Sequence, residues 1–268
     1  MRKKIIIMGT PGFVVPIFDK IAAAHDVLAV FTRAPKPAGR KQIPTKSPVH
    51  VWAESKGVPI FTSIKEIENA PRPDYIIVAA YGVILKQNVL DFAPCVNIHP
   101  SALPKYRGAS PIISAIMNGE AESAVCVMQM AAEVDAGDVF MRESFSIGEN
   151  ETAADVEKKV SKIAGEMILK YLENPDAYPS APQMGAPTFT KKIAADEARI
   201  DWRKTAREIH NQVRAIGGRA IVNGIDVKIL ETAVENGELK IKVVQPAGKK
   251  PMRWADFMNG QRGKCVLD

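Results

Sequence analysis

Short, uninterrupted apolar segments alternate with helical segments in the first part of the chain, and this alternation constrains the fold most. The predicted strands cover residues 4–8, 27–32, 59–61, 75–80 and 95–98, and the predicted helices cover 14–23, 48–56 and 84–91. Strands without polar alternation are buried on both faces, which is typical of a parallel sheet between helices. The sequence therefore predicts an α/β fold with a Rossmann-like, mostly parallel sheet.

The rest of the chain divides into a continuation of this domain and a smaller module. A helix is predicted at 111–118, strands at 123–130 and 138–146, and a long amphipathic helix at 152–173. Four prolines interrupt residues 174–190, which is typical of a linker. Beyond it, a helix at 204–215 and short strands at 220–222, 227–230 and 239–244 predict a small β-rich module. We therefore expect domains at 1–178 and 196–268, joined by a linker at 179–195.

Positive charge is concentrated in one loop and in the C-terminal module. Residues 33–46 contain no acidic side chain and five cations, Arg33, Lys36, Arg40, Lys41 and Lys46. Residues 196–268 hold 14 Lys and Arg against 10 Asp and Glu, within a net charge of +6 for the chain. Such a surplus indicates an anionic partner such as nucleic acid. A solvated basic surface is the alternative that charge alone leaves open.

Several classes of protein are disfavoured by what the sequence lacks. The three cysteines are scattered, and no Cys or His spacing predicts a metal site. The apolar run after the N-terminus is too short for a signal peptide, and no run reaches the length of a membrane span. We expect a cytoplasmic protein without metal and without membrane contact.

The segment from Asn97 to Pro111, together with Asp135, carries the candidate chemistry. Asn97 and His99 lie two residues apart at the end of a predicted strand, so their side chains share one face. A stiff loop with three prolines follows, and Asp135 lies in a turn that returns a carboxylate towards the histidine. Polar residues at the carboxyl ends of parallel strands are placed where such sheets bind ligands. We predict Asn97, His99 and Asp135 as catalytic residues.

Two other enzymatic interpretations are weaker. Gly9-Thr10-Pro11-Gly12 follows the first strand but does not match the dinucleotide-binding pattern, and no acidic residue ends the second strand. A Ser-His-Asp hydrolase would need Ser101 or Ser110 as nucleophile, and neither lies in the glycine-flanked turn that exposes such a serine.

These motifs resemble the formyltransferases that use 10-formyltetrahydrofolate. The segment Asn97-x-His99-Pro-Ser-Ala-Leu-Pro104-x-x-Arg107-Gly108, with Asp135, carries the resemblance to the superfamily. Pro37-Ala-Gly-Arg40, Ala80-Tyr-Gly82, Ile200-Asp-Trp202 and Gln245-Pro-x-Gly-Lys-Lys250 are similar to the branch of the superfamily that acts on initiator methionyl-tRNA. In that branch the C-terminal module is an OB-like domain, and here the stretch before Gln245 is shorter than in relatives.

The resemblance implies a reaction and a set of binding residues. The formyl group of 10-formyltetrahydrofolate passes to the α-amine of methionyl-initiator tRNA; Asn97 and His99 donate to the formyl oxygen, and Asp135 orients His99. The implied folate-binding residues are Ser101, Ala102, Leu103, Pro104, Tyr81, Gly82 and Leu85. The implied tRNA contacts are Arg33, Lys36, Arg40, Lys41 and Lys46, with Arg40 as the principal one, and 196–268 as an OB-like tRNA-binding domain. We expect a monomer.

Two further functions remain open on the sequence alone. Formyltransferases acting on a nucleotide sugar or a purine precursor share the Asn, His and Asp set, so this set does not separate them. An RNA-binding protein without catalysis would keep the basic loop but would have no need of the catalytic residues.

Overall fold

The computed structural model of the chain describes residues 1–39, 41–261 and 266. These residues form two compact units. Unit 1 comprises Met1–Ala109, Ser123–Phe145 and Glu157–Phe189, and unit 2 comprises Ser110–Glu122, Ser146–Val156 and residues from Thr190 onwards.

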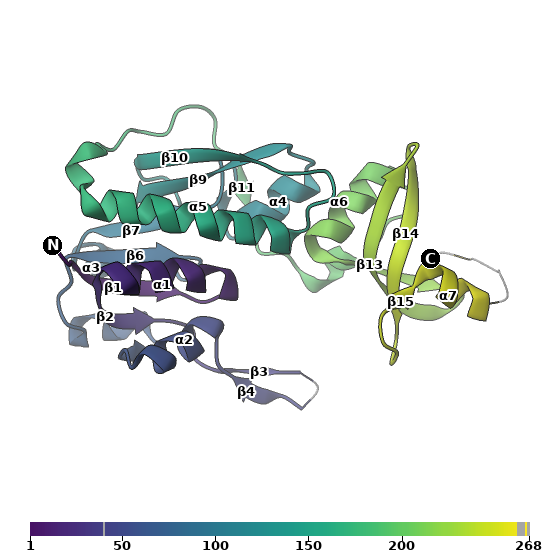
Figure 1. The fold of residues 1–268 in the computed structure, drawn as a ribbon, viewed down its shortest axis with the longest axis horizontal. Helices are drawn as coiled ribbons and strands as arrows, with labels where there is room; N and C mark the ends of the chain where they lie inside the picture. The colour runs from purple at the N-terminus through teal and green to yellow at the C-terminus, as the bar shows by residue number, and fades with distance from the viewer. Residues whose placement is uncertain (40, 262–265, 267–268) are drawn as a thin grey trace. The chain divides into compact units, whose positions relative to one another are not determined.

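A seven-stranded sheet in strand order β10-β9-β7-β6-β1-β2-β5 organises the first part of the chain (Figure 1). Its strands are β1 (Lys4–Gly9), β2 (Asp26–Phe31), β5 (Ile60–Phe61), β6 (Tyr75–Ala79), β7 (Cys95–His99), β9 (Glu122–Gln129) and β10 (Val139–Ser146). Strands β5, β2, β1, β6 and β7 run parallel, and β9 is antiparallel to β7. The predicted Rossmann-like, mostly parallel sheet is therefore confirmed.

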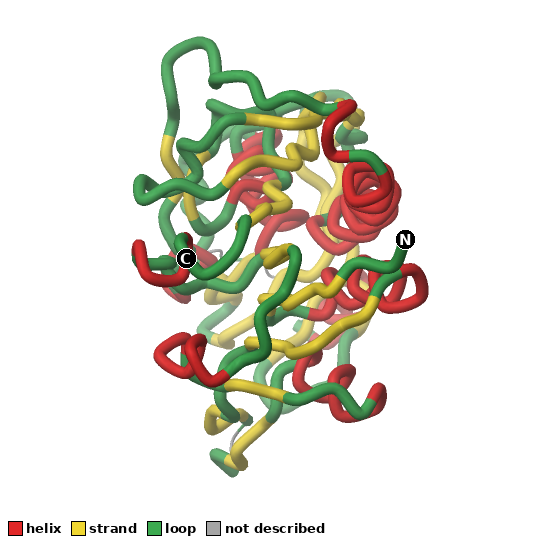
Figure 2. The backbone as a smooth tube through the Cα atoms, turned by 90° about the vertical axis from the view of Figure 1, so that its left-hand side faces the viewer, coloured by secondary structure: helices red, strands yellow, loops and turns green. Residues whose placement is uncertain are grey.

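Helices cover both faces of this sheet. The helical elements of the first part of the chain are η1 (Gly12–Val14), α1 (Val15–Ala24), α2 (Pro48–Lys56), η2 (Ile64–Asn69), α3 (Gln87–Leu90) and α5 (Ala153–Glu173). Helices α1 and α5 lie side by side on one face (Figures 1 and 2), and Lys20 of α1 is 3.7 Å from the Glu166 carboxylate of α5. Elements η2 and α3 pack on the opposite face.

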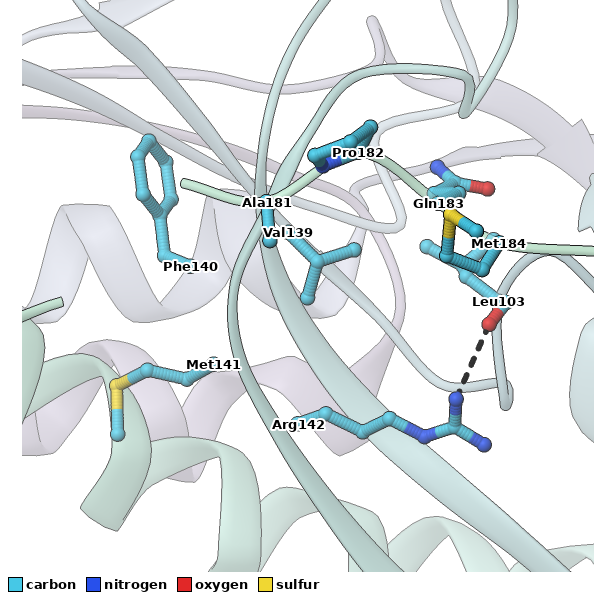
Figure 3. Close-up of a pocket in the computed structure, with 9 residues that line it drawn as sticks. All are labelled: Leu103, Val139, Phe140, Met141, Arg142, Ala181, Pro182, Gln183 and Met184. Atoms are coloured by element: carbon cyan, nitrogen blue, oxygen red, sulfur yellow. Dashed lines mark hydrogen bonds between the residues drawn. The ribbon is translucent and has the colours of Figure 1, made fainter. Parts of the chain in front are cut away.

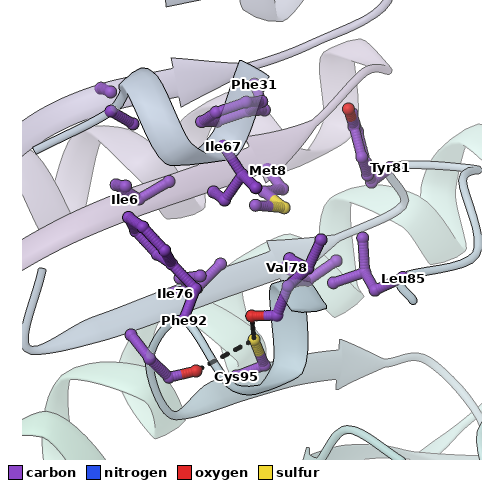
Figure 4. Packing of buried hydrophobic residues seen from close by; sticks show 14 residues of the cluster. Ile6, Met8, Phe31, Ile67, Ile76, Val78, Tyr81, Leu85, Phe92 and Cys95 are labelled. Carbon is purple, nitrogen blue, oxygen red and sulfur yellow. Dashed lines mark hydrogen bonds between the residues drawn. The ribbon is translucent and has the colours of Figure 1, made fainter. Parts of the chain in front are cut away.

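The core on the η2 and α3 face explains why the strand sequences are continuously apolar. Ile6, Met8, Ile76 and Val78 point to this face and pack against Ile67 of η2 (Figure 4). The alternate residues of the same strands point to the α1 and α5 face, so each strand needs apolar side chains on both sides. Cys95 of β7 belongs to the η2 and α3 core, so the residues two and four positions further along β7 share that face.

Two segments differ from the sequence predictions, and a third, the proline-rich one, is held by neighbouring strands. The basic loop contains a short antiparallel hairpin of β3 (Lys36–Ala38) and β4 (Ile43–Thr45). The helix predicted at 84–91 is limited to α3, because Lys86, the residue before it, has an extended backbone. The proline-rich segment contains η3 (Pro175–Ala177), pairs with β10 at Ala181, and ends in β11 (Phe189–Thr190), which pairs with β8 (Arg107–Gly108).

Unit 2 is built around helix α6 and a four-stranded antiparallel sheet. Its elements are α4 (Pro111–Met117), η4 (Ala195–Ala198), α6 (Ala206–Ile216), β12 (Gly218–Val222), β13 (Ile225–Glu235), β14 (Glu238–Pro246), β15 (Met252–Arg253) and α7 (Trp254–Gly260). Two Asn-Gly turns, at Asn223 between β12 and β13 and at Asn236 between β13 and β14, adopt the positive φ angles that such hairpin turns require. The sheet order is β12-β13-β14-β15, with β12 and β15 at its edges. An OB-fold has five strands, so four are present among the described residues of this module.

Buried polar side chains hold unit 2 together. Arg214 of α6 donates to the carbonyl oxygens of Gly148 and Glu151 at 3.1 and 2.9 Å. His210, one turn earlier, donates from Nε2 to the Glu149 carbonyl oxygen at 3.1 Å, and its Nδ1 lies 2.9 Å from the Thr232 hydroxyl. Helix α6 thus fixes the 146–152 segment, which is distant in sequence.

Candidate active site

Strand β7 presents Asn97 and His99 at the carboxyl end of the sheet. The strand lies between β6 and β9, and both side chains are buried. Because side chains alternate along a strand, they point to the same face as Cys95. His99 is the last residue of the strand, so its ring lies where the chain leaves the sheet.

Asp135 brings its carboxylate to this pair from the loop between β9 and β10. The Asn97 side-chain amide donates to Oδ1 at 3.3 Å, and the Gly108 backbone N–H donates to Oδ2 at 2.8 Å. Nδ1 of His99 lies 3.6 Å from Oδ2. The three predicted catalytic side chains therefore meet at one point, although Asp135 is distant in sequence from the other two.

The orientation of the His99 ring is fixed from its other nitrogen. Nε2 lies 3.0 Å from the carbonyl oxygen of Tyr106. Since a carbonyl oxygen only accepts hydrogen bonds, Nε2 carries a proton. Nδ1 then faces the Asp135 carboxylate. Tyr106 has a φ of 61°, an uncommon value for a non-glycine residue, and this backbone conformation belongs to the turn that presents its carbonyl oxygen to the ring.

This arrangement combines N–H donors with a carboxylate, and the donor side chains are buried. An amide and an imidazolium N–H stabilise an oxygen on which negative charge develops. A carboxylate beside them accepts a proton or orients the imidazole. The site thus suits attack of an amine on a carbonyl-type carbon.

The predicted folate-binding residues fall into two loops of unit 1. In the first, Ser101 is fully buried and donates to the Lys105 carbonyl oxygen at 2.6 Å, Leu103 packs against Cys126 and Met128, and Ala102 is half-buried. Pro104 follows a cis peptide bond. These contacts fix the loop independently of any ligand.

The second predicted folate loop follows β6. Tyr81 and Leu85 are buried in the η2 and α3 core, whereas Gly82 is exposed with a φ of 76°. The Tyr81 carbonyl oxygen accepts a hydrogen bond from the Thr10 hydroxyl at 3.2 Å, so this loop lies beside the turn after β1. Tyr81 and Leu85 belong to the core of the face to which Asn97 and His99 point.

The predicted tRNA contacts lie in and beside the β3–β4 hairpin. Arg33, Lys36, Lys41 and Lys46 are exposed, and Lys46 forms an ion pair with Glu54. Arg40 lies outside the described residues. The two ends of the hairpin segment are joined by a hydrogen bond of 2.7 Å between the buried hydroxyls of Thr32 and Ser47.

A cavity of about 320 Å³ adjoins the first folate loop (Figure 3). It is lined by Leu103, Val139, Phe140, Met141, Arg142, Ala181, Pro182, Gln183 and Met184. Arg142 donates to the Leu103 carbonyl oxygen at 3.2 Å, which ties β10 to the loop. Leu103 is the predicted folate residue that this cavity includes.

Among the described residues, no group of three or more His, Cys, Asp and Glu side chains is arranged to hold a metal ion. The described helices likewise include none with the length and apolar character needed to cross a membrane.

Gln183 is a residue of the site that sequence reasoning missed. Its side-chain amide contacts the backbone of the Asp135 loop and the guanidinium of Arg107. It lies in the proline-rich segment that was assigned to a linker, where no periodicity marks it. Nothing in the local sequence indicates that it reaches a loop almost fifty residues away.

Comparison with known proteins identifies the class. A family profile described as formyl transferase matches residues 1–172, and one described as formyl transferase, C-terminal domain, matches residues 192–240. The chain belongs to the formyl transferase family.

Curated relatives of this family are similar over nearly the whole chain. The methionyl-tRNA formyltransferase of Anaplasma marginale is 38% identical over 297 aligned residues, with 98% of each chain covered. That of Paracoccus denitrificans is 37% identical, covering 99% of this chain and all of the relative. The alignment with the first relative exceeds the 268 residues of this chain, so that relative carries segments that this chain lacks.

Solved structures share the fold at lower identity. Methionyl-tRNA formyltransferase from Clostridium thermocellum has a TM-score of 0.65 at 18% identity, covering 92% of this chain and 99% of that one. The N-formyltransferase from Helicobacter canadensis, solved with folinic acid and dTDP-3-aminofucose, has a TM-score of 0.66 at 22% identity, covering 88% and 89%. These likenesses bear on the fold alone.

Proposed function

We propose that this chain transfers the formyl group of 10-formyltetrahydrofolate to the α-amine of methionine on initiator tRNA, for translation initiation. The observation that carries the proposal is the near end-to-end similarity to curated methionyl-tRNA formyltransferases. The meeting of Asn97, His99 and Asp135 at the end of β7 supports it chemically.

Each of the three side chains has a distinct role in the proposed reaction. 10-Formyltetrahydrofolate supplies an activated formyl group. We propose that the Asn97 amide and the Nδ1–H of a protonated His99 donate to the formyl oxygen as the methionyl nitrogen forms a bond to the formyl carbon. Nδ1 is the ring nitrogen that can do so, because it lies 3.6 Å from Asp135 and is not held in a hydrogen bond there, whereas Nε2 is bonded to Tyr106. Asp135 orients His99 and accepts the proton that the amine loses, directly or through a water molecule. The bond from the formyl carbon to the folate nitrogen breaks, and that nitrogen takes up the proton that Asp135 accepted, so Asp135 is a carboxylate again.

The folate is proposed to contact the two loops of unit 1 that the resemblance indicates. Ser101, Ala102, Leu103 and Pro104 form a loop held by its own hydrogen bonds, and Tyr81, Gly82 and Leu85 form a second loop anchored in the core. Both loops leave parallel strands at their carboxyl ends, where ligands bind in such sheets. Their fixed backbones would hold a flat ring system without a large ordering cost.

The β3–β4 hairpin is proposed as a contact for tRNA phosphates. Arg33, Lys36, Arg40, Lys41 and Lys46 supply positive charge, and four of them are described and exposed. Phosphate contacts of this kind position the nucleic acid and depend on salt. We further propose domains at 1–178 for catalysis and 196–268 for tRNA binding, a linker at 179–195, a monomeric state and a cytoplasmic location.

A formylation assay tests the function and the catalytic residues together. The protein is incubated with charged initiator tRNA and 10-formyltetrahydrofolate, and formyl-methionine is quantified. We expect turnover by the wild type, and a loss of about 10²–10³-fold in kcat for Asn97→Ala and for His99→Ala. Asn88→Ala, an exposed asparagine on α3, is the matched control and retains activity. Absence of turnover by folded wild type, or full turnover by His99→Ala, contradicts the proposal.

Charge reversal in the hairpin distinguishes tRNA from a small amine substrate. Arg40→Glu with Lys41→Glu is expected to raise KM for tRNA and to make formylation less sensitive to salt. Lys65→Glu with Lys162→Glu changes the same charge on exposed positions elsewhere and serves as the control. Turnover of an amino sugar nucleotide, with none of charged tRNA, favours the sugar-modifying alternative. Salt-dependent tRNA binding without turnover favours an RNA-binding protein.

A further inference from the structure

The proline-rich strap, residues 179–190, is attached to the loops around the site. Ala181 exchanges two backbone hydrogen bonds with Val139 of β10, at 2.8 and 3.0 Å. Further along, the Thr188 carbonyl oxygen accepts from the Arg107 N–H at 2.9 Å, and the Thr188 hydroxyl accepts from the Tyr106 N–H at 2.8 Å. The strap is therefore held on both sides of Gln183.

Between these attachments, Gln183 forms hydrogen bonds with both the nitrogen and the oxygen of its side-chain amide. Nε2 donates to the carbonyl oxygens of Asp135 and Gly137, both at 2.8 Å. Oε1 accepts from Nη2 and Nε of Arg107, at 2.8 and 3.1 Å. A glutamine amide has two N–H donors and two acceptor sites, so these four bonds use its full capacity. Such complete use is typical of a structural anchor rather than of a solvated side chain.

The Asp135 loop, which Gln183 contacts, has an uncommon backbone conformation and is tightly packed. Asp135 has a φ of 50°, in the left-handed region that non-glycine residues rarely adopt. At Gly137, an added Cβ would lie 2.0 Å from the carbonyl oxygen of Gln129, so the loop closes tightly on the end of β9. The far side of the loop is fixed by the bond of 2.8 Å from the Gln129 N–H to the Asp138 carbonyl oxygen. Gln183 supplies the restraint at Asp135 itself.

Arg107 connects the same amide to the motif that contacts the Asp135 carboxylate. Its guanidinium donates to Gln183 and lies 3.4 Å from the Glu133 carboxylate. The next residue, Gly108, donates its N–H to Oδ2 of Asp135. Asp135 is thus fixed at two points, because Gln183 bonds to its backbone carbonyl oxygen and Gly108 bonds to its carboxylate. Arg107 connects these two points, since it donates to Gln183 and precedes Gly108 in the chain.

We propose that Gln183 is a positioning residue, which holds the Asp135 backbone so that its carboxylate meets Asn97 and His99. This inference rests on the proposed function for its kinetic consequences only, because the loop geometry is measurable without turnover. Gln183 touches no reacting atom in this role. It acts on the reaction through Asp135.

The first experiment compares Gln183→Leu with the wild type in formylation kinetics. A misplacement of about 1 Å costs about 10²-fold in rate, so we expect kcat to fall about 10–100-fold, with KM for tRNA changed less than about threefold. Met184→Ala, at an exposed neighbour in the same strap, is the control and keeps kcat. Wild-type kcat for Gln183→Leu overturns the proposal.

A double-mutant cycle separates positioning from a general structural role. In an Asp135→Ala background, Gln183→Leu is expected to lower kcat less than about twofold, because the group it positions is gone. An equal fold loss in both backgrounds contradicts action through Asp135. Gln183→Glu provides a second variant, which keeps the acceptor for Arg107 and loses the donors. Its kcat relative to the wild type is expected to rise as pH falls and the carboxyl group regains a proton to donate.

Amide hydrogen exchange provides a readout that does not need turnover. We expect faster exchange in residues 134–138 of Gln183→Leu than in the wild type or Met184→Ala, with exchange in β1 and β6 unchanged. Unchanged exchange at 134–138 overturns the positioning role even if the protein is inactive on tRNA. Faster exchange in a protein that does not formylate tRNA leaves the positioning role supported and contradicts the proposed substrate.

Discussion

Gly137→Ala tests whether the packing of the Asp135 loop controls the rate of the proposed reaction. The added Cβ would lie 2.0 Å from the Gln129 carbonyl oxygen, where ordinary contact begins at 3.4 Å, so the Asp135 loop or the end of β9 must move by about 1.4 Å. The three nearest atoms are backbone atoms of Gln129 and Met130, so no flexible side chain absorbs the shift. A displacement of this size costs about 10²-fold in rate, or about 2.7 kcal/mol of transition-state stabilisation.

The assay for this prediction is single-turnover formylation at saturating tRNA, together with urea denaturation. We expect kcat of Gly137→Ala to fall about 10²-fold, and the free energy of unfolding to fall by about 1–3 kcal/mol, as is usual for overpacking. Gly260→Ala, where a Cβ meets nothing within 4 Å, is the matched control. If Gly137→Ala keeps kcat within about threefold of the wild type, the reasoning that the loop position controls the carboxylate is refuted.

Three further outcomes follow from packing and burial. Gly9→Ala places a Cβ 2.6 Å from the Phe18 ring and 2.8 Å from the Ala79 carbonyl oxygen, and we expect urea denaturation to show a loss of about 1–3 kcal/mol. Burial lowers the pKa of His210, so as pH falls below about 6.5 the unfolded chain binds a proton more readily than the folded chain. The free energy of unfolding should therefore decrease from pH 7.5 to pH 5.5. The decrease should be smaller in His210→Asn. Burial raises the pKa of the Cys95 thiol to about 12, so peptide mapping after iodoacetamide treatment at pH 8 should find Cys95 unlabelled in the native protein and labelled in urea.

The order of strands and helices in unit 1 was predictable because these elements have recognisable local sequence patterns. Ile5-Ile6-Ile7 can be satisfied only by a strand that is covered on both faces, and the prediction of such a strand is confirmed as β1. The long helix was equally clear, since Val156, Val160 and Met167 recur at helical spacing and are fully or almost fully buried. Local periodicity and burial therefore agree wherever an element packs along its whole length.

Elements that depend on distant partners were not predictable in the same way. The strap around Gln183 has no periodicity, and its position is set by bonds to Val139, Arg107 and Asp135. Helix α7 and strand β15 are short, and their pattern is indistinguishable from that of a loop. The catalytic roles of Asn97, His99 and Asp135 were inferred from their spacing and the resemblance, and they stay predictions until the variants are assayed.

The bond between the Thr32 and Ser47 hydroxyls has a consequence for how this protein can change. It closes the hairpin segment at its base, and the same Ser47 oxygen accepts the His50 N–H at the start of α2. We therefore expect that changes in the length or sequence of the segment between these two hydroxyls leave the strand before it and the helix after it in place. Because the proposed tRNA contacts lie in this segment, we expect that changes in it alter the choice of substrate while the sheet stays the same.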